Sequence, residues 1–291
     1  MLDQTTKTLI ACALAEDVGS GDVTTTALIP ADLRAAGRVL ARQRLMVCGQ
    51  EVAAYVCHLI DPELEYRPLI PDGQFAADGE VMAEVAGRFG AILQAERLLL
   101  NFLQRLSGIA TMTSQLVSAV SHTGVKLLDT RKTTPGWRTL EKYAVKVGGG
   151  TNHRIGLFDQ VLIKNNHIDA VGGDVAGAIK RCRAAVPSSM KVEVEVRNFA
   201  ELAAALTAGP DIIMLDNMDV AQLRQAVAQI RSTPGGERIL IEASGGIGPE
   251  SVVRVAESGV DALSMGMLTH SVKAADISLR FASKPRTDGA S

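Results

Sequence analysis

The sequence predicts an α/β protein built on parallel strands, and three observations support this prediction. Six short apolar segments of strand length follow one another from residue 125 onward, at 125–130, 160–165, 191–196, 211–217, 238–244 and 262–266. Helix-like stretches at 199–208, 219–231 and 249–257 separate several of them, and Asn198, Asp219 and Pro249 stand where helices begin. Repeated strand–helix units imply parallel strands with right-handed crossovers. The pattern allows a barrel or a doubly wound sheet, and six strands are too few for a closed eight-stranded barrel.

The first 120 residues lack this alternation and predict a separate α+β domain. Helix-like stretches lie at 2–16, 50–60 and 91–106, and strand-like stretches lie at 38–49, 63–70 and 80–86. We place the first domain at 1–115 and the second at 116–270, with the boundary inside helical sequence, and we expect residues from about 271 to pack back on the first domain. The tail 284–291 is expected to be disordered.

Composition excludes several classes of protein. The 291 residues are 47% hydrophobic and 21% charged, which is ordinary for a soluble protein. A net charge of −2 and only 3% aromatic residues argue against nucleic-acid binding. No apolar run approaches the ~18 residues of a membrane span, and the N-terminus lacks the pattern of a signal peptide. The four cysteines form no CxxC pair, so we expect reduced thiols and a cytoplasmic location.

Polar residues gather where the predicted strands end, which is where parallel α/β folds bind ligands. Segment 126–167 holds eight Lys or Arg against three Asp or Glu, although the chain as a whole is slightly acidic. Such a pocket suits a ligand with several carboxylates or phosphates. The residues that follow strands or glycines are assigned to this pocket: Arg131, Lys132, His153, Arg154 and Lys164. Arg138, Lys142 and Lys146 are expected on an exposed helix face instead.

Two glycine-containing turns follow the last two predicted strands. Ser244-Gly245-Gly246 and Ser264-Met265-Gly266 stand where barrel enzymes hold a phosphate through backbone N–H groups. Ordinary tight turns are the alternative. Glu195 and Asp216 end neighbouring strands, where carboxylates can hold Mg²⁺, accept ribose hydroxyls or stabilise a developing cation.

Glu193 lies deeper in its strand than Glu195, and we interpret it as structural. None of the five histidines has zinc-site spacing, so no zinc site is expected.

Several strings, in order along the chain, resemble the family of quinolinate phosphoribosyltransferase, also called nicotinate-nucleotide pyrophosphorylase (carboxylating). The longest is DTRKTTPGWRTLEKYAVKVGGGTNHRIGLFDQVLIKNNHI at 129–168. The others are EDVGSGDVTT (16–25), ERLLLNFLQRLSGIAT (96–111), VEVEV (192–196), LDNM (215–218), EASGGI (242–247) and GMLTHS (266–271). The resemblance covers nearly the whole chain. Met267 and Ala275 are slight departures from the pattern, and only Met267 bears on a ligand loop.

The resemblance implies a fold and a reaction. The fold would be an N-terminal open α/β sandwich followed by an incomplete parallel α/β barrel of about six strands. The enzyme would be a pentosyltransferase that transfers phosphoribosyl from phosphoribosyl pyrophosphate to quinolinate, giving nicotinate mononucleotide, CO₂ and pyrophosphate in NAD biosynthesis. Mg²⁺ would accompany phosphoribosyl pyrophosphate, without a nicotinamide or flavin cofactor. The assembly would be a homodimer with shared active sites, or a hexamer formed as a trimer of dimers.

The resemblance also assigns roles to individual residues. Quinolinate would be bound by Arg131, His153, Arg154 and Lys164, together with Arg97 from the partner subunit. Lys132, Glu195 and Asp216 would be catalytic and would face phosphoribosyl pyrophosphate, with the last two near Mg²⁺. The same substrate would contact Ser244, Gly245, Gly246, Ser264, Gly266 and His270, which belong to or flank the two glycine turns.

Three alternatives remain at the level of sequence. A relative linked to molybdenum transport shares the fold and part of the motifs. A phosphosugar lyase or aldolase could use Lys164 as a Schiff base. A nucleotide-binding protein without catalytic activity is the third.

Overall fold

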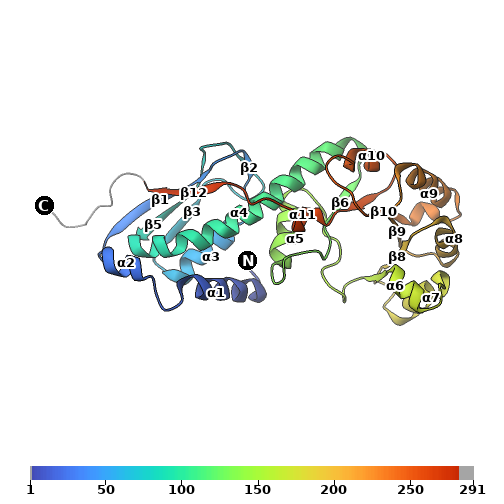
Figure 1. Ribbon diagram of the computed structural model, residues 1–291, viewed down its shortest axis with the longest axis horizontal. Coiled ribbons are helices and arrows are strands. Elements are labelled where there is room, and N and C mark those ends of the chain that lie inside the picture. Colours follow the sequence, from blue (N-terminus) through green and yellow to red (C-terminus); the bar gives the residue numbers. More distant parts are fainter. Residues whose placement is uncertain (1, 282–291) are drawn as a thin grey trace. The chain divides into compact units, whose positions relative to one another are not determined.

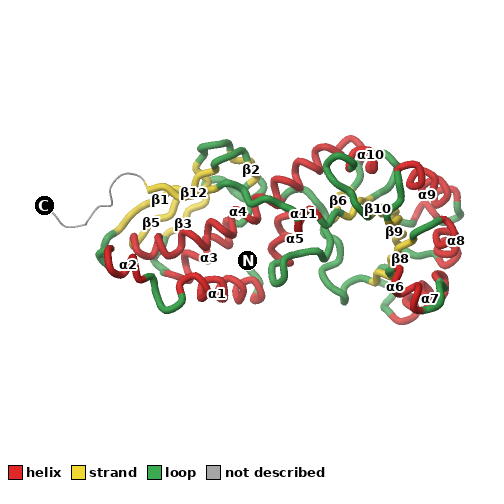
Figure 2. Tube along the Cα trace, in the orientation of Figure 1, coloured by secondary structure: helices red, strands yellow, loops and turns green. Residues whose placement is uncertain are grey.

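A computed structural model describes residues 2–281 of the chain, and Figures 1 and 2 show helices and strands along it. The chain divides into two units. The first holds the residues up to Ser114, the segment Thr134–Gly149 and the described residues from Ser271 onward; the second holds Gln115–Thr133 and Gly150–His270. The sequence prediction for the tail 284–291 falls outside the described residues.

A four-stranded antiparallel sheet forms the centre of the first unit, with the strand order β12-β1-β5-β3. Because β12 pairs with β1 through Ala41↔Ile277 and the following positions, the end of the chain completes the N-terminal sheet. The strands are β1 (Arg34–Ala41), β3 (Glu65–Pro68), β5 (Val81–Arg88) and β12 (Ile277–Phe281), and a small second sheet pairs β2 (Leu45–Met46) with β4 (Phe75–Ala76). The helices are α1 (Gln4–Val18), α2 (Val23–Leu28), α3 (Gln50–Ile60) and α4 (Phe89–Val120).

Helix α4 is twice as long as the stretch 91–106 that the sequence predicted, with 32 residues. It contains no proline, and its buried apolar positions continue through Leu116 and Val120. The helix therefore passes without a break from the first unit into the second. Among residues 2–281, no helix combines the length and the apolar character needed to cross a membrane.

Segment Thr134–Gly149, which contains α5 (Arg138–Val147), belongs to the first unit, although the sequence boundary assigned it to the second. Trp137 stacks on Phe102 of α4 with ring centroids 4.6 Å apart. Arg105 of α4 pairs with the fully buried Glu141 of α5 at 2.6 Å. A buried ion pair and an aromatic stack tie the two helices together. Of the three residues expected on an exposed face of α5, Lys146 is exposed, Arg138 is half-buried and Lys142 is buried. The prediction is therefore wrong for Lys142, because this side of the helix also packs.

Six parallel strands form the second unit, in the order β6-β11-β10-β9-β8-β7. Helices α7, α8 and α9 lie along its outer side (Figure 1). The strands are β6 (Lys126–Leu128), β7 (Val161–Ile163), β8 (Val192–Val196), β9 (Ile212–Asp216), β10 (Leu240–Ser244) and β11 (Ala262–Ser264). The helices are α6 (Asn165–Ala170), α7 (Val175–Ala185), α8 (Phe199–Ala208), α9 (Val220–Ser232), α10 (Val252–Ala256) and α11 (Met267–His270), with 3₁₀ turns at Ser121–Thr123 and Gly236–Arg238.

The predicted incomplete barrel of about six strands is confirmed. The two end strands, β6 and β7, are not hydrogen-bonded to each other within the described residues. In a regular βαβ unit the helix between them would cover the same sheet. Here the helix in the connection between β6 and β7 is α5, which belongs to the first unit. The second unit therefore lacks a helix that would cover the sheet between its two end strands.

The predicted helix starts at Asn198 and Asp219 are confirmed as N-caps, because each side chain accepts a hydrogen bond from the backbone N–H three residues later. The predicted start at Pro249 is wrong. Helix α10 begins at Val252 and has only five residues. Pro249 lies in the turn before it, since the N–H groups of Ser251 and Val252 bond to the carbonyl of Gly248.

We expect Leu99→Ala in α4 to lower the free energy of unfolding by about 2–5 kcal/mol, because the side chain is fully buried and its removal leaves a cavity. The matched control is Leu28→Ala at the end of α2, where the side chain is 72% exposed and the loss should stay below about 0.5 kcal/mol. Urea unfolding curves would measure both. Equal losses would contradict the packing described for α4.

Candidate active site

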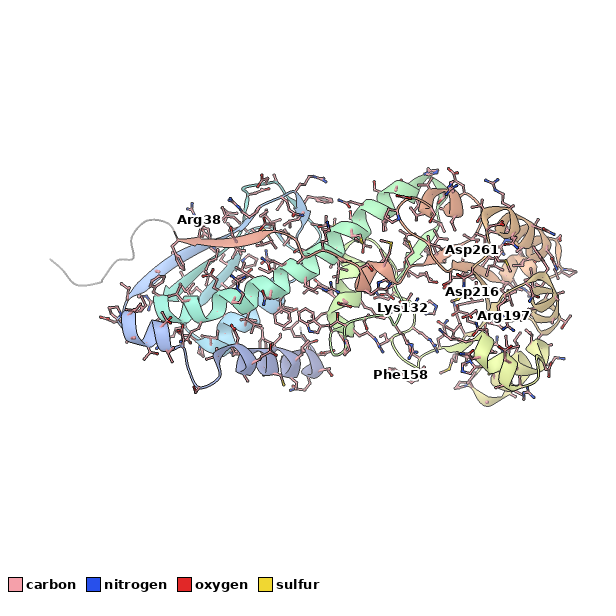
Figure 3. The ribbon with its side chains drawn as sticks, viewed as in Figure 1. Arg38, Lys132, Phe158, Arg197, Asp216 and Asp261 are labelled. Atoms are coloured by element: carbon pink, nitrogen blue, oxygen red, sulfur yellow. The ribbon has the colours of Figure 1, made fainter. Side chains whose placement is uncertain are left out.

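A cavity of about 760 Å³ lies at the carboxyl ends of the six parallel strands of the second unit. Its volume falls in the range of small-molecule sites. Each site residue predicted in this unit lines the cavity: Arg131, Lys132, His153, Arg154, Lys164, Glu195, Asp216, Ser244, Gly245, Gly246, Ser264, Gly266 and His270. Lys132 and Asp216 are labelled in Figure 3. Arg97 lies in the first unit, on α4, with an exposed side chain.

Two guanidinium groups create the positive character of this cavity. Arg154 is only 8% exposed, and its Nη1 donates to the carbonyl of Gln160 at 3.2 Å. Burial, and then repulsion from Arg131, lower the pKa of Arg154. Two cations kept close together in a partly buried place form a site for an anion, because an anionic ligand would relieve their repulsion.

Glu195 and Asp216 give the same cavity a negative region. They stand on neighbouring strands β8 and β9, and Glu195 is 7% exposed. Burial, followed by the charge of Asp216, raises the pKa of Glu195, while Lys164 opposes this shift. Both carboxyl groups line the same cavity, and the charge of Asp216 adds to the effect of burial on Glu195. Such a pair of hard oxygen donors fits a divalent cation such as Mg²⁺, or positive charge that develops on a substrate.

Backbone groups and glycines shape the remaining wall. Gly245 has a φ of 103°, and a side chain there would lie 2.2 Å from Oδ1 of Asn217. Asn217 itself adopts a φ of 55° and donates from Nδ2 to Asp216 at 2.8 Å. At Gly266 a Cβ would lie 2.8 Å from the Lys132 side chain and 3.1 Å from His270. The glycines therefore let polar side chains approach the loops closely.

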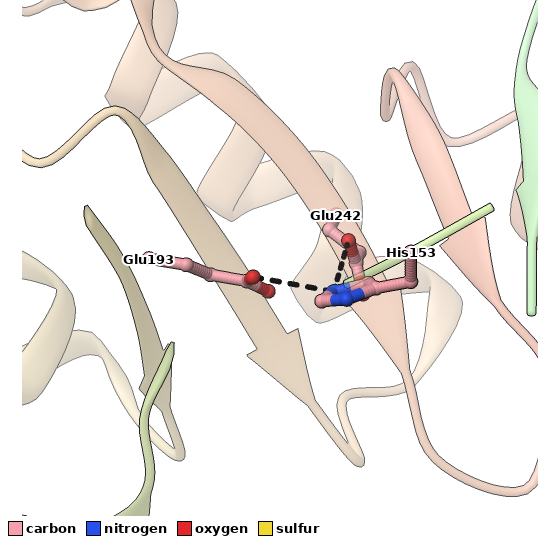
Figure 4. A group of neighbouring side chains, drawn as sticks. All are labelled: His153, Glu193 and Glu242. Atoms are coloured by element: carbon pink, nitrogen blue, oxygen red, sulfur yellow. Dashed lines mark ion pairs between the residues drawn. The ribbon is translucent and has the colours of Figure 1, made fainter. Parts of the chain in front are cut away.

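His153 reaches the barrel interior, where its ring lies between two glutamates (Figure 4). Its Nε2 is 3.2 Å from Oε2 of Glu193 and 3.6 Å from Oε2 of Glu242. Its Nδ1 accepts the backbone N–H of Arg154 at 2.7 Å. Both ring nitrogens thus face protein groups. The side chain is 8% exposed, and it forms part of the cavity wall.

Sequence reasoning did not give Asp129 and Gln160 a role at the site. Asp129 is fully buried at the end of β6 and accepts from the backbone N–H of His153 at 2.9 Å and from Asn152 at 2.6 Å. Gln160 donates to Glu193 at 2.6 Å. The signal for Asp129 was its position directly after an apolar strand, whereas nothing local marks Gln160.

Fold and cavity together define an α/β-barrel protein with a highly charged cavity that suits an anionic small molecule. Sequence profiles of the family agree with this class. The N-terminal domain of quinolinate phosphoribosyl transferase matches residues 22–107, and its C-terminal domain matches residues 109–280. The chain belongs to the quinolinate phosphoribosyl transferase family.

Individual relatives match along most of their length. The chain is 43% identical to nicotinate-nucleotide pyrophosphorylase [carboxylating] of Mycobacterium leprae, covering 92% of this chain and 94% of the relative. It is 41% identical to a probable enzyme of the same name from Bacillus subtilis, covering 91% and 89%. The solved structure of nicotinate-nucleotide pyrophosphorylase from Francisella tularensis superimposes with a TM-score of 0.91 at 40% identity, covering 97% of this chain and 98% of that one.

We expect Gly245→Ala to lower the free energy of unfolding by about 2 kcal/mol or more, because the new side chain meets Asn217 and the backbone keeps a positive φ. Gly246→Ala and Gly209→Ala are matched controls. Both have φ near 60° and open space around the Cβ position, so each should show only the left-handed backbone cost of about 1 kcal/mol. Thermal unfolding of the three variants would test this, and a Gly245 variant no worse than the controls would contradict the close contact.

Proposed function

We propose that this chain transfers a phosphoribosyl group from phosphoribosyl pyrophosphate to quinolinate, with loss of CO₂, to form nicotinate mononucleotide. The observation that carries this proposal is a single cavity in which Arg131 repels the buried Arg154 while Asp216 repels the buried Glu195. Quinolinate is a dianion, so its binding needs cationic side chains. The sugar carbon with which it reacts is electron-poor, so that end of the cavity needs carboxylates. The names of the relatives supply the identity of the two substrates.

Quinolinate carries two adjacent carboxylates, and Arg131, Arg154 and Lys164 are the cations assigned to them. Arg gives paired hydrogen bonds to a carboxylate, and Lys gives a point charge. Together they hold the ring in one orientation, which brings its nitrogen toward the sugar and lowers the entropic part of the barrier. Since both nitrogens of His153 already face protein groups, we assign it to the wall of this site.

The transfer breaks the bond between the anomeric carbon and pyrophosphate, and the ring nitrogen forms the new bond to that carbon. Positive charge develops on the sugar, and Glu195 and Asp216 stabilise it. The pyridine nitrogen then bears a positive charge. When CO₂ leaves from the neighbouring carbon, the electron pair stays on that carbon, stabilised by the charged nitrogen, and a proton replaces the lost carboxylate.

The loops Ser244–Gly246 and Ser264–Gly266 are assigned to the phosphate end of phosphoribosyl pyrophosphate, with Lys132 and His270 beside Gly266. The backbone N–H groups of these loops, the Lys132 ammonium group and the His270 ring suit a phosphate. Glu195 and Asp216 fit Mg²⁺ as oxygen ligands. When bound, Mg²⁺ neutralises charge on pyrophosphate as it departs.

We also propose that two copies share their active sites. Arg97 is exposed on α4, and the family resemblance assigns it to the partner's quinolinate. Leu157 and Phe158, each 74% exposed and adjacent in sequence, form an apolar feature that a second copy would cover; Phe158 is labelled in Figure 3. The proposed location is the cytoplasm, which the four unpaired cysteines support.

Release of CO₂ from carboxyl-labelled quinolinate, dependent on phosphoribosyl pyrophosphate and Mg²⁺, tests the reaction directly. We expect Arg131→Ala to lower kcat/KM about 10- to 150-fold, since losing one charged donor costs about 1.5–3 kcal/mol. Arg238→Ala, at a side chain that is 83% exposed and outside the cavity, is the control and should keep wild-type activity. Wild-type kcat/KM in the Arg131 variant would argue against its role.

Mixing two inactive variants tests the shared site. Arg97→Ala and Lys164→Ala should each be nearly inactive alone. Co-expressed hybrids should regain up to about half of the wild-type activity per mixed dimer, because one of the two sites then contains both wild-type residues. Mass spectrometry would establish that hybrids form. Inactive hybrids would contradict the assignment of Arg97 to the partner.

A further inference from the structure

A group of three buried titratable side chains lies inside the barrel, and the proposed reaction does not use it directly. His153, Glu193 and Glu242 bring one ring nitrogen and two carboxylate oxygens within 4.8 Å of one another (Figure 4). The two glutamates are at most 1% exposed. One oxygen of each, Oε1, has no hydrogen-bond partner among the described residues. Buried carboxylates without partners are costly, so the group requires an explanation.

A metal ion is one explanation, but the hydrogen bonds of His153 oppose it. Its Nδ1 accepts the N–H of Arg154 and therefore presents a lone pair. In a neutral imidazole the hydrogen must then be on Nε2, which faces the two glutamates. A metal on Nε2 would force the hydrogen onto Nδ1, directly against another N–H. The same conflict opposes a doubly protonated imidazolium ring. His153 thus donates from Nε2, and the group is a hydrogen-bond network.

This network ends on Arg154 by two routes. In the first route, Oε2 of Glu193 lies 3.2 Å from Nε2 of His153. The Nδ1 of His153 accepts a hydrogen bond from the backbone N–H of Arg154. The same oxygen accepts from the side-chain Nε2 of Gln160 at 2.6 Å, and the backbone carbonyl of Gln160 accepts from Nη1 of Arg154 at 3.2 Å. Glu193 therefore fixes both the backbone and the guanidinium of the most buried cation in the cavity.

We propose that Glu193 is a positioning residue that holds Arg154 in its substrate-binding orientation through His153 and Gln160. This rests on the proposed function for the identity of the substrate. Oε2 of Glu193 serves both routes, because it accepts from Gln160 and faces Nε2 of His153. Glu242 stands beside this network, since its nearest oxygen is 3.6 Å from Nε2 of His153, beyond hydrogen-bond distance.

The surroundings of Glu242 raise the pKa of its carboxyl group. Burial, and then the charge of Glu193, raise the pKa of Glu242 to about 7. The groups that face Glu242 are Glu193 on β8, His153, and Ser264 on β11. Because the folded-state pKa lies above the unfolded value of 4.5, the stability that protonated Glu242 contributes is present below about pH 4.5 and is lost as the pH rises through about 7, when a buried negative charge forms beside Glu193. Glu242→Gln mimics the protonated form and should remove this loss.

The kinetic test compares a broken network with a conserved one. Glu193→Leu removes the shared acceptor, and we expect KM for quinolinate to rise about tenfold, equivalent to about 1.4 kcal/mol, with KM for phosphoribosyl pyrophosphate changed less than about threefold. Glu193→Gln keeps an acceptor oxygen and should restore KM to within about threefold of wild type. Glu237→Gln, exposed and outside the cavity, is the control. An unchanged KM for quinolinate in a folded Glu193→Leu variant would overturn the proposal.

The pH profile and the ring tautomer give independent measurements. In the wild type, kcat/KM for quinolinate should fall as the pH rises above about 7. The Glu242→Gln variant should largely abolish this fall. With ¹⁵N-labelled histidine, His153, assigned through His153→Gln, should show a hydrogen on Nε2 at pH 6–9. A hydrogen on Nδ1, or one equivalent of bound metal that Glu193→Leu loses, would refute the network. If the wild type failed to release CO₂, the proposed function would be wrong, while the tautomer would still report on the network.

Discussion

The constraint on which the rest of the structure depends is the parallel pairing of six strands, because it brings all their carboxyl ends to one rim. Residues as distant in sequence as Arg131 and Ser264 line one cavity for this reason. The strands themselves are buried and mostly apolar, so the polar groups at their ends have only the cavity to face. The site is thus a consequence of topology before it is a consequence of any single contact.

Like charges are kept together in this cavity at a cost to the folded protein. The pKa of Arg154 is lowered and that of Glu195 is raised, each first by burial and then by a neighbour of the same sign. The protein without bound ligands would gain stability if these charges were separated. Proteins accept such unfavourable arrangements where a ligand of complementary charge relieves them. The repulsion between these like charges therefore supports a site for ligands of complementary charge.

Side chains inside the barrel support the side chains that line the cavity. Glu193 lies two residues before Glu195 on β8 and shares its side of the strand, so one strand supplies both a cavity carboxylate and a supporting one. Through His153 and Gln160, this deeper carboxylate is linked to Arg154. A rigid strand is a better base for such a network than a loop, because its backbone is fixed by hydrogen bonds on both edges.

The sequence by itself determined the six strands, the helix caps at Asn198 and Asp219, and every residue of the second unit that was assigned to the cavity. These features are local: an apolar strand followed by a polar end can be recognised within a few residues. Only the tertiary structure decided the assignment of α5 to the first unit, the burial of Lys142 and the orientation of the His153 ring. Each depends on groups far apart in the chain, such as Arg105 with Glu141 and His153 with Glu242, whose meeting no local pattern encodes.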